Sequence, residues 1–176
     1  MAMRQERRPP PPLDAAALER LALRYVERFA TTRGKLADYL GRKIRERGWD
    51  GEAADPRALA QRMADLGYVD DRLYAESKAA ALGRKGLGAR RVTMALRQAH
   101  IAQADADDLA PAIAERAGEA AITFARRKRI GPFGMPTEDR AVRDKQLAAM
   151  LRAGHGFERS RRIVVAQSEE ELDELE

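Results

Sequence analysis

Apolar residues recur along most of this 176-residue chain at intervals of three and four positions. That spacing places side chains on one face of an α-helix, and short stretches rich in glycine, proline or aspartate interrupt it. Charged residues make up 35% of the chain and β-branched residues are few, which favours helix over strand. We therefore predict an all-α fold. The pattern predicts helices at about 14–29, 35–47, 55–66, 70–82, 89–99, 104–117, 119–129, 139–152 and 157–166.

Residues with known preferences for helix ends support these boundaries. Asp14 can cap the first helix, with Leu13 before it and Leu18 inside it forming a hydrophobic staple. Pro56 follows an aspartate and is suited to the first position of the third helix. Because proline inside a helix removes a hydrogen bond, Pro111 is expected to begin or kink the sixth predicted helix.

The sequence LGYVDDRLYA, near the middle of the chain, holds two adjacent carboxylates between two tyrosines. A metal or acid–base site would use them, but helix-end chemistry accounts for both. Gly67 can end one helix and Asp70 can cap the next, while Val69 and Tyr74 have the spacing of a second staple. Asp71 in the first turn is favoured by the positive end of the helix dipole. We predict a structural joint.

Three segments of the sequence resemble one another. ADYLGRKIRERGW (37–49), VTMALRQAHI (92–101) and QLAAMLRAGHGF (146–157) each end a helix in an arginine-bearing turn followed by a large apolar residue. The helices then group into three tandem three-helix repeats. Repeats of about 50 residues have little core of their own, so we expect an elongated, curved array. The predicted parts are a disordered proline-rich leader (1–13), repeat 1 (14–67), repeat 2 (68–117), repeat 3 (118–166) and an acidic tail (167–176).

The charges are distributed unevenly. The net charge is +5, but the last nine residues, SEEELDELE, carry six acids and no base, which leaves a strongly basic body. Such a body favours a polyanionic partner, above all single-stranded or duplex DNA, although surplus arginine can also serve only to solvate a surface. A further hypothesis is that the acidic tail shields the basic face until a partner displaces it.

Two stretches concentrate the basic residues. Between residues 77 and 104 there is no acid, and a second cluster, RRKR, follows at 126–129. The predicted contacts with phosphate or with an acidic protein surface are Lys78, Arg84, Lys85, Arg90, Arg91, Arg97, Arg126, Arg127, Lys128 and Arg129. The segment GRKGLGARR lacks the spacing and the lysine–hydroxyl ending of a phosphate-binding loop. We interpret it as a turn between helices, in which Gly86 and Gly88 supply backbone freedom.

No catalytic residue or metal centre is predicted. The chain has no cysteine and two histidines, His100 and His155, which we interpret as structural caps at equivalent repeat positions. The acidic cluster around Asp105 lacks the glycine and the terminal glutamate of a calcium-binding loop. No apolar run is long enough to span a bilayer, and the N-terminus lacks the apolar core of a signal peptide. We predict a cytoplasmic protein without a cofactor, a metal or a membrane partner.

The sequence LGYVDDRLYAES, followed by RKGLGARRVTMALRQAHI, resembles the central repeat of the RecX family, whose members regulate the RecA recombinase. The resemblance covers about residues 18–166. Ala89 stands where the family commonly has proline, and Pro111 falls in what is an ordinary helix of the family. The matching residues are Leu66, Gly67, Tyr68, Asp70, Asp71, Tyr74, Ala75, Glu76, Ser77, Gly86, Gly88, Arg90, Arg91, Leu96 and Arg97.

This resemblance implies a non-enzymatic modulator of DNA recombination, DNA repair and the SOS response. Such proteins bind in the helical groove of the RecA–DNA filament and inhibit the ATPase and strand-exchange activities of RecA. The expected partners are therefore the RecA filament and DNA, met by a monomer through its basic face. The alternative is a sequence-specific regulator of the helix-turn-helix type, with residues 89–99 as the recognition helix.

Overall fold

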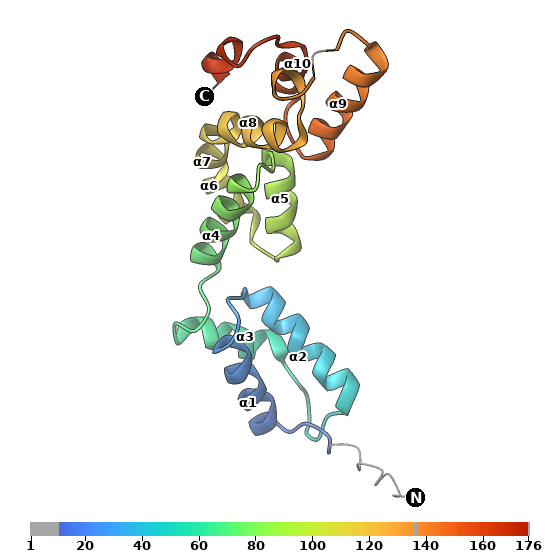
Figure 1. The fold of residues 1–176 in the computed structure, drawn as a ribbon. Helices are drawn as coiled ribbons and strands as arrows, with labels where there is room; N and C mark the ends of the chain where they lie inside the picture. The colour runs from blue at the N-terminus through green and yellow to red at the C-terminus, as the bar shows by residue number, and fades with distance from the viewer. Residues whose placement is uncertain (1–10, 136, 176) are drawn as a thin grey trace, which may run out of the picture. The chain divides into compact units, whose positions relative to one another are not determined.

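The computed structural model describes residues 11–135 and 137–175 (Figure 1). Over these residues the chain is all-helical, as predicted, and its one element of extended pairing is an isolated bridge between Leu13 and Trp49. The chain divides into two compact units, Met1–Asp71 and Arg72–Glu176.

The first unit contains α1 (Ala15–Val26), α2 (Arg33–Arg47) and α3 (Pro56–Asp65), which pack against one another. The predicted caps are confirmed at two of these helices. The Asp14 carboxylate accepts a hydrogen bond from the Ala17 N–H, and the Asp55 carboxylate accepts one from the Ala58 N–H at 2.9 Å. At α2 the helix begins two residues earlier than predicted, because Thr32 is its cap.

The core of the first unit takes one apolar stripe from each helix. Leu18 comes from α1, Leu36 and Leu40 from α2, and Met63 from α3, and all four side chains are buried. Val69, beyond the end of α3, closes the same cluster. At about 1.5–3 kcal/mol for each large apolar side chain, this cluster is the main stabilising contribution to the unit.

Leu13 also belongs to this core. Its N–H donates to the Gly48 carbonyl at 3.0 Å, and its carbonyl accepts from the Asp50 N–H at 2.9 Å. The side chain is fully buried, so the predicted staple with Leu18 is present. The predicted leader (1–13) falls largely outside the described residues, and its last residue is a core residue.

The second unit follows a longer series of helices. Pro111 stands in the first turn of α7 (Ala110–Glu115), so the predicted helix at 104–117 is two short helices, the second of which begins one residue before the proline. The elements are α4 (Asp71–Arg84, its first residue counted with the first unit), α5 (Ala89–Gln98), α6 (Gln103–Asp108), α7 (Ala110–Glu115), α8 (Ala117–Lys128), the 3₁₀ helix η1 (Gly131–Phe133), α9 (Arg140–Arg152), α10 (Phe157–Val165) and the 3₁₀ helix η2 (Glu170–Leu175).

Two hydrophobic clusters lie in this second unit. The first is small and gathers Ala75, Leu96 and Ile101 with nearby alanines of α5 and α6. The second is built by α8, α9 and α10 around buried apolar side chains such as Met150. Leu172, in the predicted acidic tail, is 3% exposed in this second cluster, so the tail packs on the unit.

Five helix ends in the described chain share one backbone motif. A residue with positive φ follows the helix, and the N–H after it bonds to the carbonyl five positions back, as Tyr68 bonds to Met63 at 2.9 Å. This motif confirms that Gly67 ends α3. It also aligns His100 with Gly154, so the prediction that the two histidines are equivalent is wrong. The positive-φ residues are Gly67, Gly86, His100, Arg129 and Gly154.

Candidate functional site

The turn between α4 and α5 is pressed against the second hydrophobic cluster of its unit. A Cβ atom on Gly86 would lie 2.8 Å from the Phe124 backbone nitrogen, and one on Gly88 would lie 2.4 Å from the Gly154 carbonyl. No side chain fits at either place, since the neighbouring atoms are backbone. The chain needs glycine here because two backbone segments approach each other closely.

Hydrogen bonds hold this turn in place. The Gly88 N–H donates to the Ala153 carbonyl at 2.9 Å, and the Arg90 N–H donates to the Gly154 carbonyl at 3.2 Å. The predicted backbone freedom applies to Gly86, whose φ is 74°, whereas Gly88 has an ordinary φ of −75°. We call the set Gly86, Gly88, Phe124, Gly154 and His155 the glycine joint.

His155 is the buried polar residue of the glycine joint. Its Nε2 lies 3.1 Å from the Gly86 carbonyl oxygen, which can only accept, so Nε2 carries the hydrogen. Burial lowers the pKa of His155 below its ordinary value of 6.5, the hydrogen bond to Gly86 opposes that change, and Arg159 adds to it. The ring also packs 5.4 Å from the ring of Phe124. A neutral imidazole therefore links α8, the turn after α9 and the turn before α5.

The predicted basic residues of the second unit lie mostly at its surface. Lys85 directly precedes Gly86, and Arg90 and Arg91 form the first turn of α5. The guanidinium of Arg127 lies 5.7 Å from the Phe124 ring centroid. The glycine joint thus brings members of both predicted clusters to its flanks. Nine of the ten are exposed and one is half-buried, namely Arg84, Lys85, Arg90, Arg91, Arg97, Arg126, Arg127, Lys128 and Arg129, with Lys78 half-buried.

Two of the predicted residues lie away from the glycine joint. Lys78 is on α4, eight residues before Gly86, which is about 12 Å along a helix. Arg97 is at the far end of α5 from the joint. These two extend the basic surface along the helices and do not belong to its centre.

The acidic tail lies against the second basic cluster. The Arg126 Nη2 is 2.9 Å from a carboxylate oxygen of Glu169, and both side chains are more than half exposed. The Arg126 guanidinium also lies 5.0 Å from the ring centroid of Phe133. An exposed pair of this kind contributes about 1 kcal/mol or less, so the buried Leu172 is the stronger anchor of the tail.

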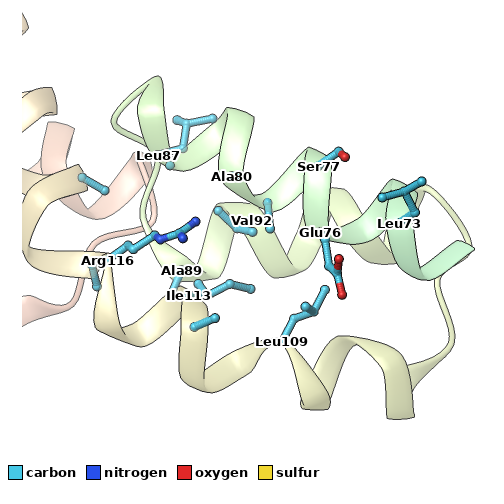
Figure 2. A pocket seen from close by; sticks show the side chains of 15 residues that line it. Leu73, Glu76, Ser77, Ala80, Leu87, Ala89, Val92, Leu109, Ile113 and Arg116 are labelled. Carbon is cyan, nitrogen blue, oxygen red and sulfur yellow. The ribbon is translucent and has the colours of Figure 1, made fainter. Parts of the chain in front are cut away.

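An apolar pocket of about 470 Å³ opens between α4, α5, α7 and α8 (Figure 2). Leu109 and Ile113 project into it, and Glu76 and Arg116 lie at opposite ends. Glu76 accepts a hydrogen bond from the Arg72 guanidinium at 3.1 Å. The lining is mostly apolar and can receive apolar groups.

The two adjacent aspartates of LGYVDDRLYA, Asp70 and Asp71, have different surroundings. Asp70 directly precedes the first residue of α4, the capping position. The buried Asp71 carboxylate accepts from the Arg33 N–H at 2.8 Å and from the Arg33 Nε at 3.0 Å. A contact across 38 residues was not predicted, and it satisfies the free N–H at the start of α2. Val69 packs in the first unit's core, and Tyr74 packs beside Ala75 and Leu96.

Two features are absent from the part of the chain that the structure describes. It contains no group of three or more His, Asp or Glu side chains placed to hold a metal ion. It also contains no helix of the length and apolarity that a bilayer-spanning segment needs.

The described chain is an all-helical protein in which exposed arginines flank a turn that backbone hydrogen bonds hold in place. The regulatory protein RecX of Myxococcus xanthus is 34% identical over 156 residues, which cover 84% of this chain and 83% of that protein. The regulatory protein RecX of Agrobacterium fabrum is 28% identical over 160 residues, or 88% and 85% of the two chains. This chain belongs to the RecX family. No family profile and no solved structure matches it.

Proposed function

We propose that this protein binds the RecA–DNA filament and inhibits the ATPase and strand-exchange activities of RecA. It acts as a monomer in the cytoplasm and so restrains recombination, DNA repair and the SOS response. The observation that carries the proposal is the likeness to two RecX regulatory proteins over most of each chain.

The glycine joint supports this proposal by holding a basic surface in one arrangement. A turn fixed by backbone hydrogen bonds and by His155 has few conformations to lose when a partner binds. The backbone that carries Lys85, Arg90 and Arg91 therefore loses little entropy when these side chains meet phosphate or acidic groups. Contacts with DNA phosphates release counterions, so binding through this surface weakens steeply with salt.

The first turn of α5 favours filament binding over the helix-turn-helix alternative. A recognition helix reads bases with residues near its N-terminus, which must enter the major groove. In α5 the N-terminal end is already in contact with the rest of the protein. The Arg90 N–H donates to the Gly154 carbonyl, and the aliphatic part of the Arg91 side chain packs on the same glycine. The exposed guanidinium groups remain suited to contacts at the surface of a partner.

The three-repeat organisation is part of the proposal. Its support is that three hydrophobic clusters follow one another along the chain, the first within 13–69, the second within 75–106 and the third within 121–172. The second and third of the proposed repeats fall in one compact unit.

RecA ATPase activity on single-stranded DNA, measured with increasing amounts of this protein, tests the proposal. We expect the rate to fall, and strand exchange to fall with it. Arg90→Glu is expected to raise the half-inhibitory concentration about tenfold, since a repulsive charge replaces an attractive one. Arg140→Glu is the matched control, because Arg140 is an exposed arginine in the first turn of α9.

Two results would contradict the proposal at different levels. If the wild-type protein leaves RecA activity unchanged, the function is wrong. If Arg90→Glu and Arg140→Glu weaken inhibition equally, the function stands and the assignment of the surface is wrong.

A further inference from the structure

Three aromatic rings form a continuous series in the first unit. Tyr25 lies near the end of α1, Phe29 in the loop after it, and Tyr39 on α2. The rings of Tyr25 and Tyr39 stack, with centroids 4.2 Å apart and planes inclined by 25°. The Phe29 ring is tilted against Tyr25 at 5.2 Å. We call these three residues the aromatic ladder.

One end of the aromatic ladder is fixed and the other is open to solvent. Tyr25 and Tyr39 are half-buried and pack against the core of the first unit, which holds their rings in place. Phe29 is 55% exposed. Burial of a phenylalanine is worth about 1.5–3 kcal/mol, and much of that is forgone here. The open face of Phe29 is therefore available to a flat apolar group.

Cations lie at the Tyr39 end of the aromatic ladder. The guanidinium carbon of Arg42 is 5.6 Å from the Tyr39 ring centroid, and the Lys43 ammonium is 5.9 Å from it. Helix α2 carries six basic and two acidic residues. One of those acids, Glu46, is shared by Lys43 and Arg42, at 2.6 and 3.6 Å, so positive charge remains in excess.

The aromatic ladder thus carries an exposed ring at its Phe29 end and an excess of positive charge at its Tyr39 end, and rings and cations along one surface are the combination that binds unpaired nucleotides. Bases stack on aromatic side chains, and nearby Lys and Arg attract the phosphates between them. In duplex DNA the base faces are covered by neighbouring bases. A duplex can therefore bind the cations through its phosphates but cannot stack a base on the ring. The arrangement thus selects single strands over duplexes.

We propose that the aromatic ladder is a binding site for single-stranded nucleic acid, with an unpaired base stacked on Phe29 and phosphates further along the same strand held by the cations of α2 at the Tyr39 end. This site is separate from the basic surface at the glycine joint, which carries the proposed function. It gives the first unit a binding function that is separate from that of the second unit.

Binding of the full-length protein to a fluorescein-labelled oligothymidylate, and to a duplex of the same length, tests this site without RecA. Phe29→Ala is expected to weaken oligothymidylate binding about tenfold, the loss of about one stacked base, and to leave duplex binding unchanged. Phe29→Leu is expected to behave like Phe29→Ala because it lacks a ring, whereas Phe29→Trp should keep the affinity.

Tyr68→Ala is the matched control. Tyr68 is also in the first unit and is 53% exposed, and it makes none of the ring contacts of the aromatic ladder. It should leave both affinities unchanged. Far-UV circular dichroism of each variant checks that the helices are intact.

Three outcomes would overturn the inference: no oligothymidylate binding by the wild type, an unchanged affinity in Phe29→Ala, or an equal loss on single strand and duplex. Each outcome is distinct from failure of the proposed function. If the wild type inhibits RecA but Phe29→Ala binds oligothymidylate as tightly as the wild type does, only the aromatic site is refuted. A protein that leaves RecA unaffected but loses oligothymidylate binding in Phe29→Ala refutes only the regulatory proposal.

Discussion

Replacing Gly88 by alanine is expected to destabilise the second unit by about 2–4 kcal/mol. The added Cβ would lie 2.4 Å from the carbonyl carbon and oxygen of Gly154 and 2.5 Å from the His155 nitrogen. All of these are backbone atoms, so no rotation of a side chain relieves the contact. The turn must move away from the cluster formed by α8, α9 and α10.

The magnitude follows from what that movement breaks. Forcing an extra carbon into a packed site costs about 1–3 kcal/mol. The hydrogen bonds from the Gly88 and Arg90 N–H groups to the Ala153 and Gly154 carbonyls are lost or stretched, at about 0.5–1.5 kcal/mol each. Against these losses, alanine lowers the conformational entropy of the unfolded chain, which stabilises the folded state by about 0.4–1 kcal/mol. This gain applies because the φ of −75° at Gly88 suits any residue.

Urea unfolding followed by far-UV circular dichroism measures this effect, with Gly83→Ala as the control. Gly83 lies within α4, where a Cβ would meet no atom within 4 Å. Alanine there should stabilise by about 0.5–1 kcal/mol, because glycine is a poor helix former. If Gly88→Ala unfolds within about 0.5 kcal/mol of the wild type, the glycine joint is not the close contact described here.

Three further predictions test other parts of the structure. Asp71→Ala should cost about 2–3 kcal/mol in urea unfolding, because it leaves the Arg33 N–H without its acceptor, and Asp71→Asn should cost less. The folded-state pKa of His155 lies below its ordinary 6.5, so stability should be complete above pH 6.5 and should be lost progressively as the pH falls from 6.5 through the lower folded-state pKa; the loss should be smaller in His155→Gln, and equal losses would contradict this prediction. Replacing the three glutamates at 169–171 by glutamine keeps the buried Leu172 and should raise DNA affinity about fivefold at low salt; an unchanged affinity would exclude shielding by the tail.

Local chemistry made the helix ends predictable. Asp14 and Asp55 cap their helices as their positions suggested, and Pro111 lies in the first turn of a helix. These outcomes depend on residues within one turn of each other, so the sequence order already contains them. Thr32 was missed as the cap of α2, although a threonine before an apolar stripe is a cap signal.

Long-range contacts could not be read in the same way. The glycines of the turn before α5 indicated flexibility, yet Gly88 is needed for its closeness to Gly154, which is 66 residues away. The link between Asp71 and Arg33 spans 38 residues. Such partners are set by how helices pack, and helical spacing within one segment does not specify which segment it will meet.

The aromatic ladder was missed for a related reason. Tyr25 and Tyr39 each lie on the core-facing side of their own helix, and their stacking depends on how α1 crosses α2. The basic character of α2 was overlooked because two acids interrupt the run, although one of them is shared by two cations. Acid-free stretches mark continuous basic runs, whereas the excess charge of α2 is spread over a helix that also contains two acids.

Co-sedimentation with RecA–DNA filaments tests the central claim most directly. The protein would be mixed with filaments assembled on single-stranded DNA, and in parallel with the DNA alone and with RecA alone. We predict that it pellets with the filaments at a salt concentration where it stays in solution with either component. Failure to pellet with the filaments, or equal pelleting with bare DNA, would contradict the account.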